Sequence, residues 1–539
     1  MVIRNSFLWL KAFISMKNKI YIIIIFCVSL LLTYKLFQNG MWSVQDDLHI
    51  FRLSEYHLCL KSGQIPCRYS PNSALGFGSP VFNFYPPAVY QIAELFHLIG
   101  FSFIDSTKII YILPLFFGPL FMYIFTRLFW GSNGGLISAL VFATAPYQAL
   151  NLFVRGALAE NFALNLIPVI FYFYTKKYHK LTILFITIIF LTHQLTTLIT
   201  LGLLLVFSIY NKSVKRLVKY LIWSIGLSAF FLLPSIFEKN LTTNYLMTQG
   251  YFNYIIHFAT LKQLFVDRFW GFGASLWGPK DDMSFQIGHL QWLLPVITII
   301  VTSITPRQRG DNRFLILGIF ILGLFFAFLT HNKSTFIWQL LPFMAYFQFP
   351  WRFLGAIILC FSFISGAIIL FIPQQFKNIF VALILIVLIL LNFSYFKVDQ
   401  WQNIGDQQKL SGDNLIAQQG AGLTDFYPKF STNFPTVNTH KDIQISKNSQ
   451  VAYGQITVDD ASVTVNLPIA YFPKMELRLD TQKIPYRIEP NLGLIQFDIP
   501  HGTHHFYLRF LNTPIRTISN YISIIFLFGF IIKSIREQK

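Results

Sequence analysis

Long runs of apolar residues, separated by short polar segments, follow one another along most of the chain. The runs match or approach the roughly 20 residues that an α-helix needs to cross about 30 Å of hydrocarbon. They predict membrane-spanning helices rather than the buried helices of a soluble core. The clearest runs are residues 20–38, 108–128, 157–175, 314–330, 351–372, 378–395 and 517–533.

The pattern changes between residues 397 and 515, where apolar and polar residues alternate with a period of two. Such alternation is typical of half-buried β-strands, and Asn-Leu-Gly and Pro-His-Gly turns separate the alternating stretches. These residues predict a small antiparallel β-sandwich before the last membrane helix. The alternating stretches are residues 455–458, 463–467, 475–479 and 505–510.

Basic residues are sorted between alternate loops. The chain is 54% hydrophobic and 12% charged, with a net charge of +19 that is also typical of nucleic-acid-binding proteins. The basic residues instead collect in the loops expected inside the cell, which argues against nucleic acid and places both termini in the cytoplasm. The clusters are Arg4/Lys11/Lys17/Lys19, Lys176/Lys177/Lys180, Lys212/Lys215/Arg216/Lys219, Arg307/Arg309/Arg313, Lys377 and Lys533/Arg536/Lys539.

The same charge rule decides two ambiguous stretches. Lys180 and Lys212 both belong inside, so the residues between them form two short crossings that meet near His193, below the outer surface. Residues 86–100 are interpreted as a helix in the membrane interface, because a crossing there would invert every later loop. The resulting twelve crossings are 20–38, 106–129, 135–150, 157–175, 181–192, 194–211, 217–234, 288–304, 314–330, 351–372, 378–395 and 516–533.

The expected fold class is therefore an α-helical polytopic membrane protein with an extracytoplasmic β-sandwich domain inserted before the last helix. The first run lacks a small-residue cleavage site and is expected to remain as an anchor in the cytoplasmic membrane. The three predicted parts are a multi-span membrane domain at 1–396 with its first outer loop at 39–105, the β-sandwich at 397–515, and the final helix with a cytoplasmic tail at 516–539.

The cysteines divide by location. Cys27 and Cys360 fall within predicted spans and are interpreted as inert apolar residues. Cys59 and Cys67 share the first outer loop, eight residues apart, in a compartment where a disulfide persists. Their spacing leaves both the bridged and the free state open.

Unusual polar residues converge on the outer side of this topology. Asp46 and Asp47 open the first outer loop shortly after an apolar run, where acidic residues have few structural uses. The candidate catalytic residues are Asp46, Asp47, His49, Glu160 and His193. The candidate substrate-binding residues are Arg52, Arg155, Trp351 and Arg352.

Each candidate also has a structural explanation. One aspartate suffices to cap a helix that begins at Leu48, and Glu160 suits the dipole of a helix N-terminus. Arg352 is long enough to reach lipid headgroups from a helix end. His193 is harder to explain by packing, because ionisable groups at membrane depth normally line a cavity.

His49 and Arg52 have their own structural explanation, as ordinary interfacial residues.

Seven short motifs, in their order along the chain, carry a resemblance to known proteins: DDLHIFRL, SGQIPCRYSPN, GFGSPVFNFYPP, RGALAE, THQL, QFPWRF and TDFYPKF. The chain resembles bacterial polytopic membrane proteins described as 6-pyruvoyl-tetrahydropterin-synthase-related. These are similar to the wider C-type (GT-C) glycosyltransferase superfamily. The resemblance covers essentially the whole chain, although the tight spacing from Asp47 to His49 leaves open which aspartate is catalytic.

The resemblance implies transfer of a sugar from a polyprenyl-phosphate donor to a cell-envelope glycan, lipid or protein on the outer face. An aspartate would act as the base for the acceptor hydroxyl, and a single displacement would invert the anomeric centre. Arg352 and Arg155 suit the leaving phosphate, because arginine binds phosphate through two parallel hydrogen bonds. A divalent cation such as Mg²⁺ or Mn²⁺, held by Asp46, Asp47 or Glu160, is an alternative way to neutralise that phosphate.

Two other classes of function are compatible with many spans. A lipid-linked sugar transporter or flippase would usually show internal repeats and a site near the bilayer midplane. A non-catalytic scaffold that displays the β-domain would leave the acidic pair without a purpose. The clustering of polar residues on one face favours the glycosyltransferase.

Overall fold

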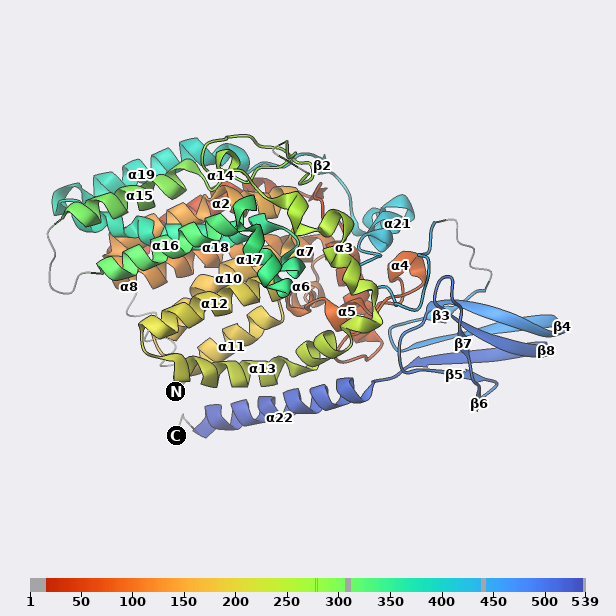
Figure 1. Cartoon of the computed structure of the whole chain (residues 1–539). Helices are drawn as coiled ribbons and strands as arrows, with labels where there is room; N and C mark the ends of the chain where they lie inside the picture. The colour runs from red at the N-terminus through yellow and green to blue at the C-terminus, as the bar shows by residue number, and fades with distance from the viewer. Residues whose placement is uncertain (1–15, 277, 279, 306–311, 438–442, 537–539) are drawn as a thin grey trace.

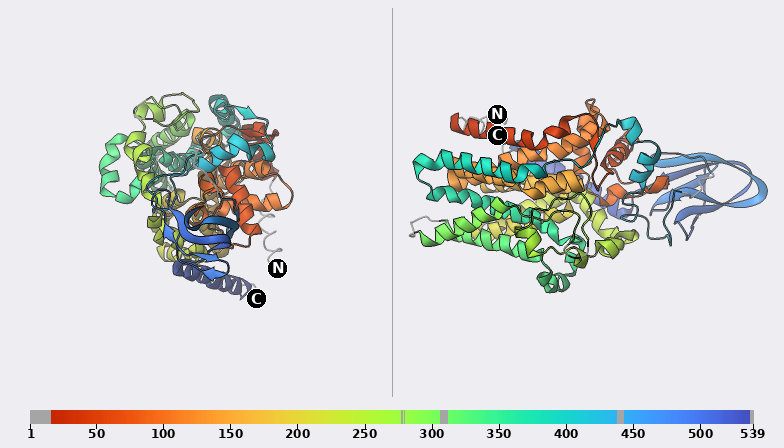
Figure 2. Two further views of the ribbon diagram at one scale, coloured as in Figure 1. Left: turned by 90° about the vertical axis from the view of Figure 1, so that its right-hand side faces the viewer. Right: turned by 90° about the horizontal axis from the view of Figure 1, so that it is seen from above.

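Long helices run roughly side by side, and an antiparallel sheet projects from one end of this bundle (Figure 1). The computed structural model describes residues 16–276, 278, 280–305, 312–437 and 443–536. α22 returns from the sheet along the outside of the bundle (Figures 1 and 2). The predicted combination of a helical bundle and a C-terminal β-sheet domain is confirmed.

Helical residues occupy all of the expected spans. Gly131 adopts a left-handed φ of 70° inside α8, which breaks that helix between the expected spans 106–129 and 135–150. The main helices are α2 (Met16–Thr33), α3 (His49–Lys61), α6 (Ala88–Leu98), α7 (Phe103–Ile112), α8 (Pro114–Ala143), α10 (Leu158–Thr175), α11 (His179–Phe190), α12 (Gln194–Tyr210), α13 (Val214–Phe237), α15 (His289–Ile304), α16 (Arg313–Leu329), α17 (Thr335–Leu340), α18 (Leu354–Ser365), α19 (Lys377–Asn392) and α22 (Pro514–Arg536).

Six helices in the described part of the chain are long and apolar enough to cross a membrane, or seven if the bent pair of α16 with residues 332–340 is one span. Three further apolar helices, α11, α12 and α15, are shorter. The protein is therefore a multi-pass membrane protein. The count of twelve crossings stays a prediction, because several expected spans are short or interrupted helices.

Loops that the charge rule assigns to the cytoplasm meet at the end of the bundle opposite the sheet. Lys180 donates to the carbonyl oxygen of Ser534 near the end of α22, over 2.9 Å. Ser132, beside the break in α8, donates to Asn18 near the start of α2, over 3.0 Å. The relative grouping of these loops agrees with the charge rule, and the side of the membrane on which they lie stays a prediction. Arg4, Lys11, Arg307, Arg309 and Lys539 lie outside the described residues.

The sheet has six strands in one hydrogen-bonded network, in the order β3-β4-β8-β5-β6, with β7 on β8. Its inward side chains, including Leu467, Leu477 and Ile495, are fully buried, as the period of two predicts. The strands are β3 (Ser446–Lys447), β4 (Val451–Ala470), β5 (Met475–Leu479), β6 (Gln482–Lys483), β7 (Arg487–Ile488) and β8 (Leu494–Phe510).

The long β4–β8 ribbon doubles back on itself. Gln450, just before β4, donates to the carbonyl oxygen of Ser62, and the amide of Ala470 at the other end of β4 donates to Phe77. Both ends of β4 therefore contact one short segment, and the register shift between Val458 and Ser462 marks the bend. The predicted sandwich is thus made from one folded sheet rather than from two separate sheets.

Residues 397–428, which we call the strap, do not join this sheet. They lie over the first outer loop, where β2 (Trp401–Gln402) pairs antiparallel with β1 (Met41–Trp42). The strap continues through α20 (Asp406–Lys409) and α21 (Gly412–Gly420). Because β1 and β2 are hydrogen-bonded to each other, the strap holds the start of the first outer loop in place.

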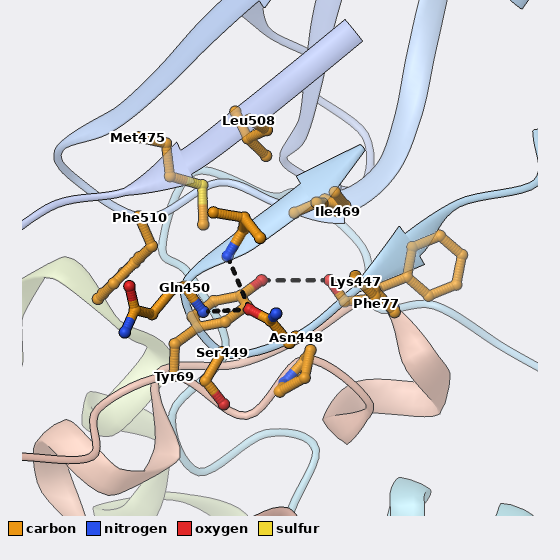
Figure 3. A pocket seen from close by; sticks show the side chains of 13 residues that line it. Tyr69, Phe77, Lys447, Asn448, Ser449, Gln450, Ile469, Met475, Leu508 and Phe510 are labelled. Carbon is orange, nitrogen blue, oxygen red and sulfur yellow. Dashed lines mark hydrogen bonds between the residues drawn. The ribbon is translucent and has the colours of Figure 1, made fainter. Parts of the chain in front are cut away.

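Cys59 and Cys67 form a disulfide, which settles the alternative that the spacing left open. Cys27 and Cys360 are free thiols. The segment that follows the bridge contacts the base of the sheet around a cavity of about 20 Å³ that Tyr69 and Phe510 help to line (Figure 3). A cavity of this size has room for about one water molecule, so the joint is closely packed.

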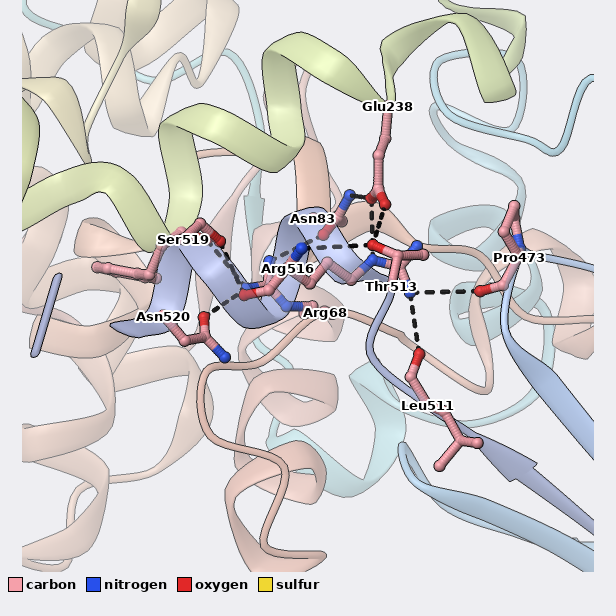
Figure 4. A network of polar contacts seen from close by, with 10 residues as sticks. Arg68, Asn83, Glu238, Pro473, Leu511, Thr513, Arg516, Ser519 and Asn520 are labelled. Carbon is pink, nitrogen blue, oxygen red and sulfur yellow. Dashed lines mark hydrogen bonds and ion pairs between the residues drawn. The ribbon is translucent and has the colours of Figure 1, made fainter. Parts of the chain in front are cut away.

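Two buried arginines share one glutamate where the sheet meets the bundle (Figure 4). Glu238, at the end of α13, accepts a hydrogen bond of 2.9 Å from Nε of Arg516. Asn83 links the same carboxylate to Arg68, over 2.8 Å and 2.9 Å. Packing of Arg68 away from water and the nearby charge of Arg516 lower the pKa of Arg68 to about 9. Glu238 therefore compensates two buried arginines that come from distant segments of the chain.

Removal of that single negative charge should loosen the joint. Glu238→Gln leaves Arg68 and Arg516 buried without an acidic partner, which typically costs about 3–5 kcal/mol. We expect a clearly lower thermal midpoint for the protein in detergent. Asp498→Asn is the matched control, because it breaks an ion pair with Arg487 whose side chains are 52% and 61% exposed. A midpoint for Glu238→Gln no lower than that of the control would contradict this account of the joint.

Candidate functional site

The first outer loop is held against the loop that leads into α10. The amide of Gln45 donates to the carbonyl oxygen of Val154 over 3.0 Å, and the amide of Asp46 donates to that of Arg155 over 2.9 Å. Gly156 adopts a φ of +64°, and a side chain on it would meet Val44 at 2.6 Å. Glycine at this position therefore lets the two backbones approach, and their pairing sets Asp46 beside Arg155.

One buried carboxylate contacts both arginines, Arg155 and Arg352, that the sequence analysis assigned to the phosphate. Glu160, in the first turn of α10, lies 2.9 Å from Nη2 of Arg155 and 3.3 Å from Nε of Arg352. Tyr147 donates to its other oxygen over 2.5 Å. Arg155 ends a π-helical turn, η2 (Leu150–Arg155), a geometry that is frequent at functional sites. Glu160 is thus compensated from two sides.

Aromatic and backbone contacts fix the orientation of these arginines. The guanidinium of Arg155 lies over the ring of Trp351, 4.6 Å from its centroid. Nη1 of Arg352 donates to Phe347 and Gln348 over 2.9 Å and 3.0 Å. Nε of Arg352 is buried and makes no hydrogen bond within the described residues. Its nearest acceptor is Glu160, at the ion-pair distance of 3.3 Å.

The two neighbouring aspartates have different surroundings. Asp47 pairs with Lys409 of the strap over 2.6 Å, and the side chain of that lysine is 2% exposed. The carboxylate of Asp46 accepts no hydrogen bond from any described residue and is open to solvent. Neither aspartate caps α3, whose cap residue is Leu48 without a side-chain hydrogen bond. The capping explanation is therefore wrong, and the aspartates are not equivalent.

Asp46 stands among cations. Enclosure by protein raises the pKa of its carboxyl, while the charges of Arg155, Arg352 and Arg52 act in the opposite direction. The side chain is nevertheless exposed to solvent. Asp46 is therefore an accessible carboxylate whose electrostatic partners come from three separate segments.

His49 and Arg52 form a second cluster beside Asp46. Nδ1 of His49 lies 2.8 Å from the hydroxyl of Tyr90, and Arg52 lies over the ring of Tyr85, 4.5 Å from its centroid. Burial lowers the pKa of His49 to about 3, so the imidazole is neutral at physiological pH. Both residues are buried, which excludes the explanation that they are ordinary interfacial residues.

His193 begins α12 and lies close enough to Glu160 to interact with it electrostatically. Its Nδ1 is 2.8 Å from the hydroxyl of Thr196, so the ring caps the helix as well. All nine candidate residues lie around one region at the ends of α3, α10, α12 and α18 that are on the side of the sheet. Within the described residues, no group of three or more His, Cys, Asp or Glu could hold a metal ion.

Asp425 is a member of this region that sequence reasoning did not single out. A side chain on Gly422 would meet Oδ2 of Asp425 at 2.8 Å and Nη2 of Arg52 at 3.1 Å, so the strap brings a second carboxylate toward the first outer loop. Burial, together with the charge of Asp46, raises the pKa of Asp425 to about 6, against the opposing effect of Arg52. The only signal in the sequence is its place in the TDFYPKF motif.

No family model matches the sequence, and no curated protein matches it. Among solved structures, the chain is similar to ArnT from Cupriavidus metallidurans bound to undecaprenyl phosphate, at 11% identity and a TM-score of 0.41, over 69% of this chain and 64% of that one. It is also similar to the arabinofuranosyltransferase AftD from Mycobacteria, at 13% identity and a TM-score of 0.40, over 69% of this chain and 26% of that one. The chain thus spans less than two thirds of each. Similarity at this level assigns no activity.

The raised pKa of Asp425 predicts that its charged form destabilises the fold, so stability depends on pH. The folded protein releases this proton near pH 6 and the unfolded chain near pH 4, so stability falls as the pH rises through this window. Asp425→Asn should therefore stabilise the protein at pH 7.5, by up to roughly 3 kcal/mol, and much less at pH 4. Thermal midpoints at both pH values test this, with Asp413→Asn in the same strap as the control. An equal effect of Asp425→Asn at both values would contradict it.

Proposed function

We propose that the protein is an integral-membrane glycosyltransferase that moves a sugar from a polyprenyl-phosphate donor to a hydroxyl group on the outer face of the membrane. The observation that carries this proposal is the accessible carboxylate of Asp46, which has no hydrogen-bond partner among the described residues and lies among three arginines. A base beside a concentrated positive charge suits a reaction that deprotonates an alcohol and releases a phosphate.

Asp46 is the base in this proposal. The acceptor hydroxyl must lose a proton as its oxygen attacks the anomeric carbon, and a carboxylate within hydrogen-bond reach can take that proton. Asp47 is less suited, because its oxygen is already bound to Lys409. Glu160 is less suited as well, because Arg155, Arg352 and Tyr147 already contact it. Attack opposite the leaving phosphate inverts the anomeric centre.

Arg352 and Arg155 receive the phosphate in this proposal. The leaving group is a phosphate ester anion, so it needs positive charge and hydrogen-bond donors rather than an acid. Both arginines face the same glutamate, and Nε of Arg352 lies 3.3 Å from it without a hydrogen bond, so neither guanidinium is fully engaged by that carboxylate. The outer ends of α10, α12 and α18 surround this point, so the prenyl tail of the donor would remain in the lipid.

The rival functions account for less of this arrangement. A transporter would place its polar groups near the middle of the bundle, whereas these residues lie where the helices begin on the side of the sheet. A scaffold would have no use for a carboxylate kept free of partners.

Replacement of the base should abolish chemistry without unfolding the protein. Asp46→Asn keeps the size of the side chain and removes its ability to accept a proton, so transfer should fall by about 10²–10⁴-fold. Asp47→Asn is the matched control and should retain most turnover. The assay follows transfer of labelled sugar from a polyprenyl-phosphate donor in detergent. Full turnover by Asp46→Asn would show that the base lies elsewhere.

Arg352 should determine the affinity for the lipid phosphate. Arg352→Lys keeps the charge but loses the planar fork, and Arg352→Ala loses both, so we expect binding of polyprenyl phosphate to weaken by about tenfold and about 100-fold respectively. Binding in nanodiscs measures this, and Arg313→Ala at the opposite end of the bundle is the control. Unchanged affinity in Arg352→Ala would show that this arginine only reaches toward headgroups.

A further inference from the structure

The outward face of the β4–β8–β5 sheet carries two tyrosines that its packing does not require. Tyr453 and Tyr507 are cross-strand partners, and their side chains are 51% and 42% exposed. Neither ring contacts another aromatic ring in the described part of the chain, although paired aromatics across strands commonly do so. Their faces are therefore open to solvent.

Polar groups surround these rings on the same face. Arg478 is the partner of Tyr507 on β5, and the next row pairs Gln455 with His505. These residues line a broad depression of about 900 Å³ that is open to solvent. The opposite face of the same strands carries buried side chains such as Leu477, Phe506 and Leu508, so the two faces differ in character.

One cation on this face has no partner among the described residues. Glu476 already binds Arg478 over 3.1 Å and Lys483 over 3.0 Å. Arg509, the register partner of Glu476 on β8, is exposed, and its side chain makes no hydrogen bond or ion pair with any described residue. An exposed arginine beside two open aromatic rings thus remains for a ligand.

We propose that this face binds a glycan chain. A pyranose ring has an apolar C–H face that fits a flat tyrosine ring, and a rim of hydroxyl groups that suits Gln455, Arg478 and Arg509. A protein partner is less suited, because protein interfaces centre on a cluster of buried apolar anchors, and this face presents one pair of rings among polar side chains. The role of that glycan as the acceptor of sugar transfer rests on the proposed function.

The test measures glycan binding without catalysis. Soluble hexasaccharides of glucose, mannose, N-acetylglucosamine and galacturonate are titrated against the full-length protein in detergent, with no lipid donor present. We expect at least one of them to bind, and Tyr453→Ala and Tyr507→Ala each to weaken that binding by about tenfold, because tyrosines commonly dominate binding surfaces. Tyr507→Phe keeps the ring and should bind nearly as well as the wild type.

Two controls keep the result unambiguous. Tyr245→Ala removes an exposed tyrosine outside the sheet and should leave binding unchanged. Tyr453→Leu keeps apolar bulk without the aromatic ring, and should lose binding even where an alanine variant folds poorly. Failure of every hexasaccharide to bind the folded protein, or equal binding after removal of both tyrosines, overturns the proposal.

The outcome is separable from that of the proposed function. Glycan binding with no sugar transfer by the wild type would support this face and contradict the glycosyltransferase. Sugar transfer with no glycan binding would support the glycosyltransferase and contradict the role of this face.

Discussion

A single buried carboxylate, that of Glu160, holds two arginines together at the end of the bundle nearest the sheet. Isolated charges are costly there, so each arginine can remain charged only because a negative group faces it. The two cations share that one anion in direct contact, and the exposed carboxylate of Asp46 is a further negative group that interacts with both.

The other parts of the outer face follow from that arrangement. The backbone pairing of Asp46 with Arg155 brings a second carboxylate to the same arginines. Asp47 does not join them, because it forms an ion pair with Lys409 of the strap. The joint around Glu238 then fixes the sheet on the same end of the bundle. A base, a phosphate site and an exposed sheet face are thus assembled on one side from segments that are far apart in sequence.

The sequence predicted the helices well, because apolar runs, loop charges and turn residues are local signals. It also predicted that the nine candidate residues lie in one region, because the predicted topology alone assigns each loop to one side of the membrane. It could not distinguish Asp46 from Asp47, because the lysine that makes the difference lies 362 residues further on. Asp425 was not predicted for the same reason, since its neighbour Arg52 is also distant in the sequence. The bend of the sheet depends on a register shift, which the alternation of apolar and polar residues does not reveal.

The central claim is that the outer cluster of arginines receives the phosphate of a lipid donor beside Asp46. A cryo-EM structure of the protein with polyprenyl phosphate in nanodiscs tests this most directly. The account predicts density for the phosphate within hydrogen-bond reach of Arg352, with Asp46 facing the same space and the tail extending into lipid. Phosphate bound away from these residues, in the middle of the bundle or at its other end, would contradict it.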